Sequence, residues 1–333
     1  MNALIAVDFT PDSGLGHVRR GLAIGAALSG LGWNVTLANT ASAEIALGDG
    51  AGDIGTLSGL GSGERGTGGR GSDGLDPASL RPNFDACVID SYKATPELRR
   101  ALAPYLAIDD YYLPLPGAIA VLNPAPGADA AQYQIDEKLL GPRYALLGGD
   151  VLLARESCEE PEFPPRRVYV WLGAAGTTEL AGIVKSTLAG LLPAAEVIFP
   201  PAHANPIQPQ AGPAETQVSF NGGARYIAMA DMVVCAGGVT ALEAACIGRP
   251  TVALALAENQ LANVAGLAGE GTLVAATDST LGQVVSELLS DREKFLGLGS
   301  RGRKLVDGLG AERAAEAIGR IFSEPAGGSP HLD

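Results

Sequence analysis

The stretch DMVVCAGGVTALEAACIGRPTV, residues 231–252, decides the fold. It begins with an apolar run typical of a buried strand, turns at Gly237 and Gly238, and continues with small and apolar residues typical of a helix. A Gly-Arg-Pro sequence at 248–250 ends the helix, and another apolar strand follows. A strand, a crossover helix and a second strand form the repeating unit of a parallel α/β sheet.

The same alternation of strands and helices continues on both sides of this stretch. In the first half of the chain we expect elements at 2–8, 17–31, 33–38, 86–90, 95–103 and 105–109. In the second half we expect them at 167–172, 178–191, 195–199, 223–230, 231–235, 239–247, 250–255, 259–269, 272–275 and 279–289. The sequence therefore predicts an α/β protein of two doubly wound, Rossmann-like parallel-sheet domains that face a cleft.

Domain limits follow from where the alternation breaks. We place the first domain at 1–155 and the second at 167–310, joined by the Pro- and Glu-rich linker 156–166. The last segment, 311–333, contains a helix that could pack back on the first domain. The glycine-rich stretch 48–76 has no strict period and predicts a long flexible loop.

Length and charge exclude several classes of protein. A chain of 333 residues exceeds the usual size of one hydrophobic core, so two domains of roughly 150 residues are expected. The formal net charge of −14 argues against nucleic acid or an anionic membrane as a partner. A small anion remains compatible with this charge, because backbone N–H groups and a few arginines can hold a phosphate.

Cysteines and histidines are few. The four cysteines are far apart and form no CxxC pair, which favours a reducing cytoplasm and core positions for all of them but Cys158. The three histidines offer no His-rich metal site, and His203 and His331 are expected at the surface. We find neither a signal peptide nor an apolar run long enough to span a bilayer, so we expect a cytoplasmic protein.

A histidine flanked by glycine follows the first expected strand. Residues 13–20, SGLGHVRR, lie where open α/β sheets bind ligands. Gly14 and Gly16 begin a dinucleotide fingerprint, but Arg19 stands in place of its third glycine, so no nicotinamide cofactor is expected. The helix dipole disfavours a charged imidazole at His17, and a neutral histidine is a competent base near pH 7. The alternative is a histidine that only caps the helix or packs in the core.

Polar clusters end two further strands of the first domain, DSY at 90–92 and DDY at 109–111. Because the carboxyl ends of parallel strands meet at one edge of a sheet, these groups could line the same pocket as His17. Asp and Ser also serve as helix N-caps, which explains Ser91 and Asp109 equally well.

In the second domain, Gly237 and Gly238 permit close approach of a ligand to the backbone. The N–H groups around Val239 and Thr240 offer a seat for a diphosphate. Glu243, about one turn further along, could accept hydrogen bonds from ribose hydroxyls. The alternative is an exposed helix position, but apolar neighbours favour a buried, partnered carboxylate.

Two amides, Asn259 and Gln260, follow the strand expected at 250–255. Amide side chains both donate and accept hydrogen bonds, so they suit sugar hydroxyls and acetamido groups.

These motifs resemble a known family. SGLGHVRR, together with AGGVTALEAACIGRP at 236–250 and ENQ at 258–260, resembles glycosyltransferase-B-type (GT-B) nucleotide-sugar enzymes. More narrowly, the chain resembles the UDP-2,4-diacetamido-2,4,6-trideoxy-β-L-altropyranose hydrolases of pseudaminic acid biosynthesis and their spore-coat polysaccharide relatives. Further matches are DSY at 90–92, IDD at 108–110, LLGPRYALL at 139–147, ADMVV at 230–234 and KLVDGLGAER at 304–313. The resemblance covers nearly the whole chain and implies a GT-B-like fold.

The resemblance also implies roles for single residues. His17 would activate water, and Gly238, Thr240 and Glu243 would hold the nucleotide. Asn259 and Gln260 would contact the sugar, as would Tyr92 and Asp110. The remaining candidate substrate- and nucleotide-binding residues are Gly14, Gly16, Arg20, Gly173, Gly237 and Val239.

The resulting hypothesis is a hydrolase that releases UDP from a UDP-sugar without a metal or a cofactor. Diphosphate is already a good leaving group, so one base, His17, is enough. The rival hypotheses are a glycosyltransferase, in which His17 deprotonates an acceptor hydroxyl, and a non-catalytic nucleotide-sugar binding protein. Donor consumption without an acceptor separates the three.

Overall fold

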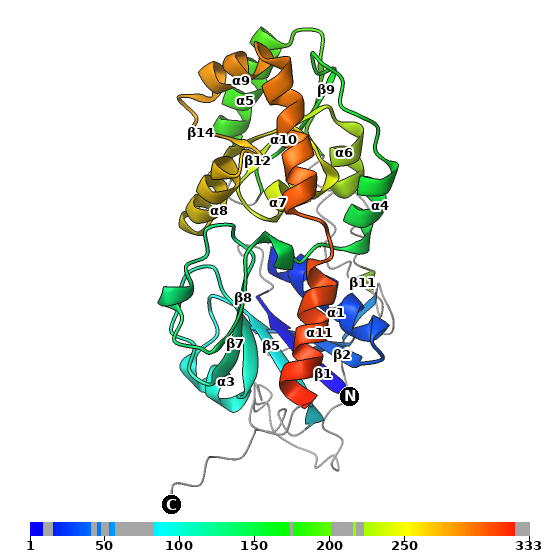
Figure 1. Cartoon of the computed structure of the whole chain (residues 1–333), viewed down its shortest axis with the longest axis vertical. Coiled ribbons are helices and arrows are strands. Elements are labelled where there is room, and N and C mark those ends of the chain that lie inside the picture. Colours follow the sequence, from blue (N-terminus) through cyan, green and yellow to red (C-terminus); the bar gives the residue numbers. More distant parts are fainter. Residues whose placement is uncertain are drawn as a thin grey trace, which may run out of the picture.

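The computed structural model describes residues 1–8, 16–40, 45–47, 53–56, 83–173, 176–200, 216–217 and 223–323. These residues form two α/β domains stacked along the long axis of the molecule (Figure 1). The expected architecture of two parallel-sheet domains is confirmed. No helix in the described part of the chain is both long and apolar enough to cross a membrane.

Six parallel strands form the centre of the first sheet, in the order β2-β1-β5-β6-β7-β8. Their bounds are β1 Asn2–Val7, β2 Asn34–Asn39, β5 Ala86–Asp90, β6 Tyr105–Ile108, β7 Ala118–Asn123 and β8 Glu137–Leu140. Successive residues of β1 are buried on opposite faces: Ile5 lies in a core with helices α1 (Gly16–Gly30) and α11 (Gly310–Ser323), and Leu4 lies in a core with Tyr105. Short helices follow three of these strands: α3 (Pro96–Ala101) after β5, η2 (Ala130–Gln132) after β7 and η3 (Pro142–Tyr144) after β8.

Three antiparallel strands extend this sheet beyond β2: β3 (Ile45–Leu47), β4 (Asp53–Thr56) and β11 (Thr216–Gln217). Because β4 lies within the stretch 48–76, the expectation of one continuous loop there is wrong for residues 53–56. The rest of that stretch lies outside the described residues. β11 comes from the second half of the chain, so the two halves share a sheet.

The second sheet has five parallel strands in the order β10-β9-β12-β13-β14. Their bounds are β9 Arg167–Trp171, β10 Glu196–Ile198, β12 Met232–Ala236, β13 Thr251–Leu254 and β14 Val274–Ala276. Helices α5 (Thr178–Leu191) and α9 (Leu281–Leu289) pack on one face. The other face is covered by α4 (Gly149–Ser157), α6 (Gly223–Met229), α7 (Val239–Ile247) and α8 (Glu258–Gly269). Helix α10 (Arg292–Leu305) packs against α7.

The chain crosses between the domains at a different place from the expected linker. Leu146 packs in the core of the first domain, whereas Ala145, Leu147 and helix α4 pack in a core of the second. The crossing therefore precedes α4, N-terminal to 156–166. The chain crosses back after α10, and α11 packs on α1 in the first domain (Figure 1).

Candidate functional site

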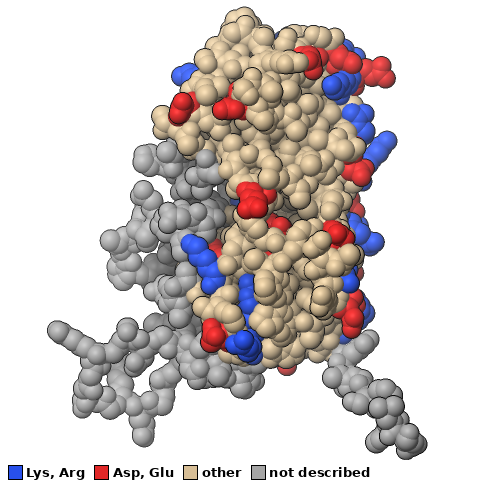
Figure 2. Space-filling view, turned by 90° about the vertical axis from the view of Figure 1, so that its left-hand side faces the viewer, with Lys and Arg blue, Asp and Glu red and all other residues tan. Residues whose placement is uncertain are grey.

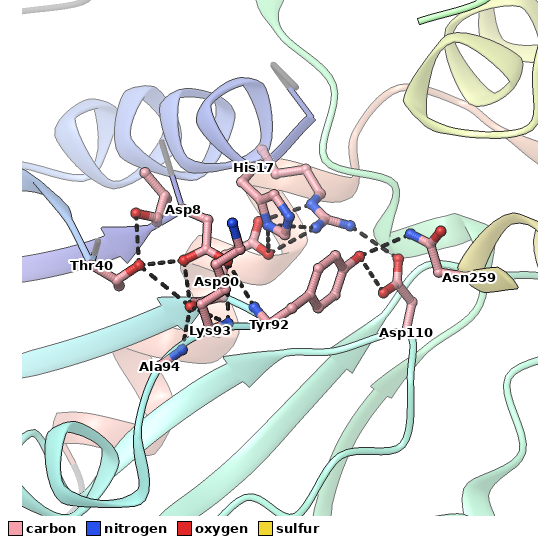
Figure 3. A network of polar contacts seen from close by, with 12 residues as sticks. Asp8, His17, Thr40, Asp90, Tyr92, Lys93, Ala94, Asp110 and Asn259 are labelled. Carbon is pink, nitrogen blue, oxygen red and sulfur yellow. Dashed lines mark hydrogen bonds and ion pairs between the residues drawn. The ribbon is translucent and has the colours of Figure 1, made fainter. Parts of the chain in front are cut away.

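His17 lies in the first turn of α1 and its ring is bonded to a carboxylate. Its Nδ1 is 2.7 Å from Oδ1 of Asp90, the last residue of β5, and both side chains are buried (Figure 3). A contact this short requires a proton between the two atoms, and an ionised carboxylate carries none. The proton is therefore on Nδ1, and Nε2 of the neutral ring is an acceptor. The histidine is held by Asp90 rather than serving only as a cap.

Arg20, one turn further along α1, fixes the same carboxylate. Its Nε and one terminal nitrogen each lie 2.8 Å from an oxygen of Asp90, and its other terminal nitrogen lies 3.4 Å from Asp110. Burial alone would raise the pKa of Asp90, but Arg20 and His17 together lower it below its usual value. Burial likewise opposes the charge on Arg20, yet Asp90, Tyr92 and Asp110 raise its pKa well above the usual value. Arg20 was expected to bind the substrate; in the structure it binds these carboxylates.

Tyr92 joins this cluster to the second domain. Its hydroxyl donates to Asp110 Oδ1 at 2.5 Å and accepts from Nδ2 of Asn259 at 3.0 Å (Figure 3). Asn259 lies in the first turn of α8, so this hydrogen bond crosses between the domains. The Tyr92 ring also meets the His17 ring edge-on, with the centroids 4.6 Å apart. The structure thus brings together four of the residues that we expected to line one pocket: His17, Tyr92, Asp110 and Asn259.

Asp8 is a residue of this site that the sequence reading missed. It directly follows β1, whereas Asp90 ends β5, and its buried carboxylate accepts from the hydroxyls of Thr40 and Ser91 and from the backbone N–H of Tyr92. Its position after a parallel strand was the available signal. Asp8 supports the loop that carries Tyr92.

Ser91 and Asp109 fix loops and cap no helix in the described part of the chain, so the N-cap role that we weighed for them is wrong; the N-cap of α3 is Thr95. Ser91 Oγ accepts from the backbone N–H of Ala94 at 2.7 Å, and Asp109 accepts from the backbone N–H of Leu113 and from the hydroxyl of Tyr133. Burial raises the pKa of Asp109. Both side chains fix the loops after β5 and β6.

The glycines after β12 have two different roles. A Cβ on Gly237 would lie 2.1 Å from Val264 Cγ2, so only glycine fits there. Its N–H donates to Leu254 O and Gln260 Oε1, and its carbonyl accepts from Asn263, so its backbone is fully used. Gly238 is the N-cap of α7, and no side chain caps this helix.

The amino ends of α1 and α7 face each other across the domain boundary. A Cβ on Gly16 would lie 3.8 Å from Cγ2 of Val239. The first N–H groups of a helix have no partner within the helix, and the dipole of each helix favours an anion at this end. Two such ends together are suited to a diphosphate. Thr240 is buried in the same first turn of α7.

Gln260 has a different role from the one we expected. Its Oε1 accepts from the backbone N–H groups of Gly237 and Leu256, at 3.1 and 2.9 Å. The side-chain carbonyl of Gln260 therefore joins the backbone just before α7 to the backbone just before α8. The amide nitrogen lies 4.0 Å from the Cβ position of Gly238, at the N-cap of α7.

Glu243 is a buried carboxylate with one partner from the other domain. Its Oε1 is 2.6 Å from a guanidinium nitrogen of Arg19, and its side chain is 5% exposed. Its Oε2 is buried and has no hydrogen-bond partner among the described residues. Burial raises the pKa of Glu243 above its usual value, and Arg19 offsets only part of this effect. Within the described residues, both side chains line a cavity of about 590 Å³ that also reaches Val239 and Gly149.

Other predicted positions are less informative. Gly173 follows β9 with a positive φ of 64°, which favours glycine. Gly14, His203 and His331 lie outside the described residues. In the described part of the chain, no three His, Cys, Asp or Glu side chains gather as metal ligands would.

Comparison with solved structures identifies the fold. MurG of Acinetobacter baumannii is 16% identical and superimposes over 96% of this chain and 99% of its own, with a TM-score of 0.59. The spinosyn forosaminyltransferase SpnP is 13% identical over 97% of this chain and all of its own, also with a TM-score of 0.59. A third structure, the spinosyn rhamnosyltransferase SpnG complexed with thymidine diphosphate, has 15% identity, the same coverage and a TM-score of 0.54. The chain therefore has the GT-B fold.

Comparison with curated proteins gives a more limited likeness. The spore coat polysaccharide biosynthesis protein SpsG of Bacillus subtilis (strain 168) is 34% identical over 104 residues. The match spans 28% of this chain and 30% of the length of SpsG. No protein-family model matches the chain.

Proposed function

We propose that the protein hydrolyses a nucleotide sugar, releasing UDP and the free sugar, with His17 as the general base. The observation that carries the proposal is the 2.7 Å contact between His17 Nδ1 and Asp90 Oδ1. It leaves Nε2 free to take a proton, and the ionised Asp90 stabilises the imidazolium that results. A histidine with only a structural role would not need a carboxylate that is itself fixed by Arg20.

The nucleotide would bind where the two domains meet. The amino ends of α1 and α7 would hold the diphosphate, and the unpartnered Oε2 of Glu243 would accept a ribose hydroxyl. An unpaired buried carboxylate oxygen is costly unless a ligand supplies its donor. The thymidine diphosphate complex of the structurally similar SpnG supports a nucleotide in this fold.

In the proposed reaction, one proton passes from water to His17, and the anomeric carbon exchanges its bond to the diphosphate for a bond to the water oxygen. A water molecule attacks the anomeric carbon and gives a proton to Nε2 of His17. The bond from this carbon to the β-phosphate oxygen breaks, and its electron pair leaves with UDP. The helix ends stabilise the charge that develops on the diphosphate, and no separate general acid is required.

The proposed sugar is a UDP-linked diacetamido-trideoxy sugar of a pseudaminic-acid-type pathway. This proposal rests on the family resemblance of the motifs and on the polar groups beside His17. Asn259 and Tyr92 form a donor and acceptor pair that suits an acetamido group. The likeness to SpsG, named for spore coat polysaccharide biosynthesis, supports a sugar substrate.

The second candidate is a glycosyltransferase. The structures that superimpose on nearly the whole chain include proteins named as glycosyltransferases, which favours this alternative. The same site residues would serve, and the mechanism would differ in one respect: His17 would deprotonate an acceptor hydroxyl in place of water.

The test is incubation of the purified protein with UDP-linked diacetamido-trideoxy sugars, with UDP and free sugar followed by NMR. We expect the wild type to release both products without an acceptor. His17→Ala should lower turnover by about 10²–10⁴-fold, the usual contribution of a general base, while UDP binding is retained. His17→Gln is the matched variant because it keeps the side-chain volume better.

Three outcomes separate the proposals. Unchanged turnover in His17→Ala would exclude this residue as the base. Turnover that begins only when a sugar acceptor is added would identify a transferase. Binding of the UDP-sugar without turnover under any condition would leave only a binding function.

A further inference from the structure

A second cavity lies between helices α4 and α6 of the second domain, which pack side by side (Figure 1). Its volume is about 420 Å³ among the described residues. Arg249, two residues before β13, lines it together with Arg167, the first residue of β9. Within the described residues, Asp150 alone lines both this cavity and the one that contains Glu243, and His17 lines neither. The proposed reaction therefore gives this cavity no role.

Arg249 is a buried cation without an anionic partner. The residue is only 2% exposed, and its Nη2 donates to the carbonyl oxygen of Ala228 at 2.5 Å. Its Nε has no acceptor, and no Asp or Glu in the described part of the chain forms an ion pair with it. The carboxylate of Asp231, which lines the same cavity, accepts instead from three backbone N–H groups at 162–167.

The remaining terminal nitrogen of Arg249, Nη1, is the atom that a ligand can reach. It carries no hydrogen bond within the described residues, and unlike Nε it is not a fully buried atom. Burial lowers the pKa of Arg249, but a guanidinium still keeps its charge at neutral pH. A buried charge without a counterion is costly, and an anion bonded to Nη1 would offset this cost.

The other charges around the cavity limit which anion suits it. Three arginines and four carboxylates line it: Arg167, Arg225, Arg249, Asp150, Glu159, Glu160 and Asp231. A dianion such as phosphate would add a second negative charge to a lining that already has more carboxylates than arginines. A singly charged carboxylate neutralises Arg249 and adds no such excess.

Two exposed apolar side chains also line the cavity. Leu153 of α4 is 69% exposed and Met229 of α6 is 41% exposed, and an apolar ligand would cover part of both. We propose that the cavity binds a small organic monocarboxylate, with the carboxylate on Nη1 of Arg249 and the apolar part against Leu153 and Met229. This site is independent of the proposed hydrolysis, so either proposal can fail alone.

Titration with benzoate and its neutral isostere benzamide, followed by ligand-observed NMR at constant ionic strength, tests the proposal. We expect benzoate to bind with a dissociation constant of about 1 mM and benzamide at least about tenfold more weakly, because benzamide forms no charge-assisted hydrogen bond with Arg249. Inorganic phosphate should also bind more weakly than benzoate, because of the acidic lining.

Two variants locate the binding. Arg249→Met keeps an apolar side chain of similar length and should weaken benzoate binding about tenfold. Leu153→Asp, at an exposed position that the fold does not need, should weaken it about threefold or more by placing a like charge beside the ligand. Leu261→Asp is its matched control, since Leu261 is 58% exposed on α8 and lines neither cavity. It should keep the wild-type dissociation constant.

Several results would overturn the proposal. Equal binding of benzoate and benzamide, or binding of neither, would show that the cavity does not select a carboxylate. Tighter binding of phosphate than of benzoate would show that it selects a dianion. Unchanged benzoate binding in Arg249→Met would place the ligand elsewhere. If that variant does not fold, equal effects of Leu153→Asp and Leu261→Asp would lead to the same conclusion.

Discussion

Asp90 orients the histidine beside it and determines which ring nitrogen of the neutral imidazole carries the proton. Arg20 bonds both of its oxygens, so Asp90 stays ionised and would not accept the proton that His17 takes from water in the proposed reaction. The same arginine lies 3.1 Å from Nδ1 of His17. When the ring becomes charged, Asp90 stabilises the imidazolium and Arg20 opposes it. Arg20 thus holds in position the carboxylate that orients His17.

The lowered pKa of Asp90 predicts a pH dependence of stability. Because the folded-state pKa is below the unfolded value of about 3.9, Asp90 contributes stability above about pH 4. This contribution is lost as the pH falls through the folded-state value. We expect Asp90→Asn to lower the free energy of unfolding by about 3 kcal/mol at neutral pH, because Arg20 loses its charged partner. The free energies of unfolding of Asp90→Asn and the wild type should approach each other as the pH falls below about 4.

Urea denaturation from neutral pH down to about pH 3 measures this difference. Asp278→Asn, at an exposed position, is the control and should change stability by no more than about 0.5 kcal/mol. A difference between Asp90→Asn and the wild type that stays constant over the whole pH range would contradict the prediction.

From the sequence, we predicted the placement of site residues near strand ends more accurately than the contacts between residues of different domains. His17, Asp90 and Asp110 follow or end parallel strands, and sheet geometry brings such positions together. Gln260 was misread because an amide suits a sugar and a backbone equally well, and only the structure shows that its carbonyl binds Gly237. The partner of Glu243 could not be predicted, because Arg19 is 224 positions away in the chain.

At the scale of elements, the sequence predicted those with a strong apolar pattern. The helices expected at 178–191 and 239–247 have these bounds in the structure. No prediction was made for β7, β8, α4 or α10. β8 is a four-residue strand at the sheet edge and is mostly half-buried, so it shows little alternation.

Helix α10 contradicts its own intrinsic propensity. It contains Gly297, Gly299 and Gly302, and glycine is among the least favourable residues in a helix. Two of them are explained by close packing on α7. A Cβ on Gly299 would lie 2.2 Å from the carbonyl oxygen of Gly248, and a Cβ on Gly302 would lie 2.8 Å from that of Ala245. The glycines let α10 approach the helix that carries Glu243.

Two glycine substitutions in α10 test this explanation. Gly299→Ala places a methyl group against backbone and should lower the free energy of unfolding by about 1–3 kcal/mol. Gly297→Ala is the matched control in the same helix, because its Cβ would meet only the flexible end of Arg301. It should be neutral or stabilise by up to about 1 kcal/mol through helix propensity. Equal effects of the two substitutions in urea denaturation would show that packing on α7 does not require the glycine.

At the scale of the whole molecule, the two domains are joined by chain crossings and shared contacts. The C-terminal helix α11 follows the second domain in the chain but completes the core of the first, on α1 (Figure 1). Because α1 also carries His17 and Arg19, the packing of α11 supports the proposed base and the contact with Glu243. On the face shown in Figure 2, acidic and basic side chains are interspersed on both domains.

Ile318, which is fully buried between α11 and the first sheet, tests whether α11 stabilises the first domain alone. Ile318→Ala should cost about 2–5 kcal/mol, and the loss should fall on the first domain, whose core contains this side chain. In scanning calorimetry we expect the transition of the first domain to move down by roughly 5–15 °C and that of the second domain to stay in place. Leu309→Ala, at an exposed position just before α11, is the control. A single transition that moves as one unit would mean that the domains unfold cooperatively, and that α11 stabilises the whole molecule rather than the domain on which it packs.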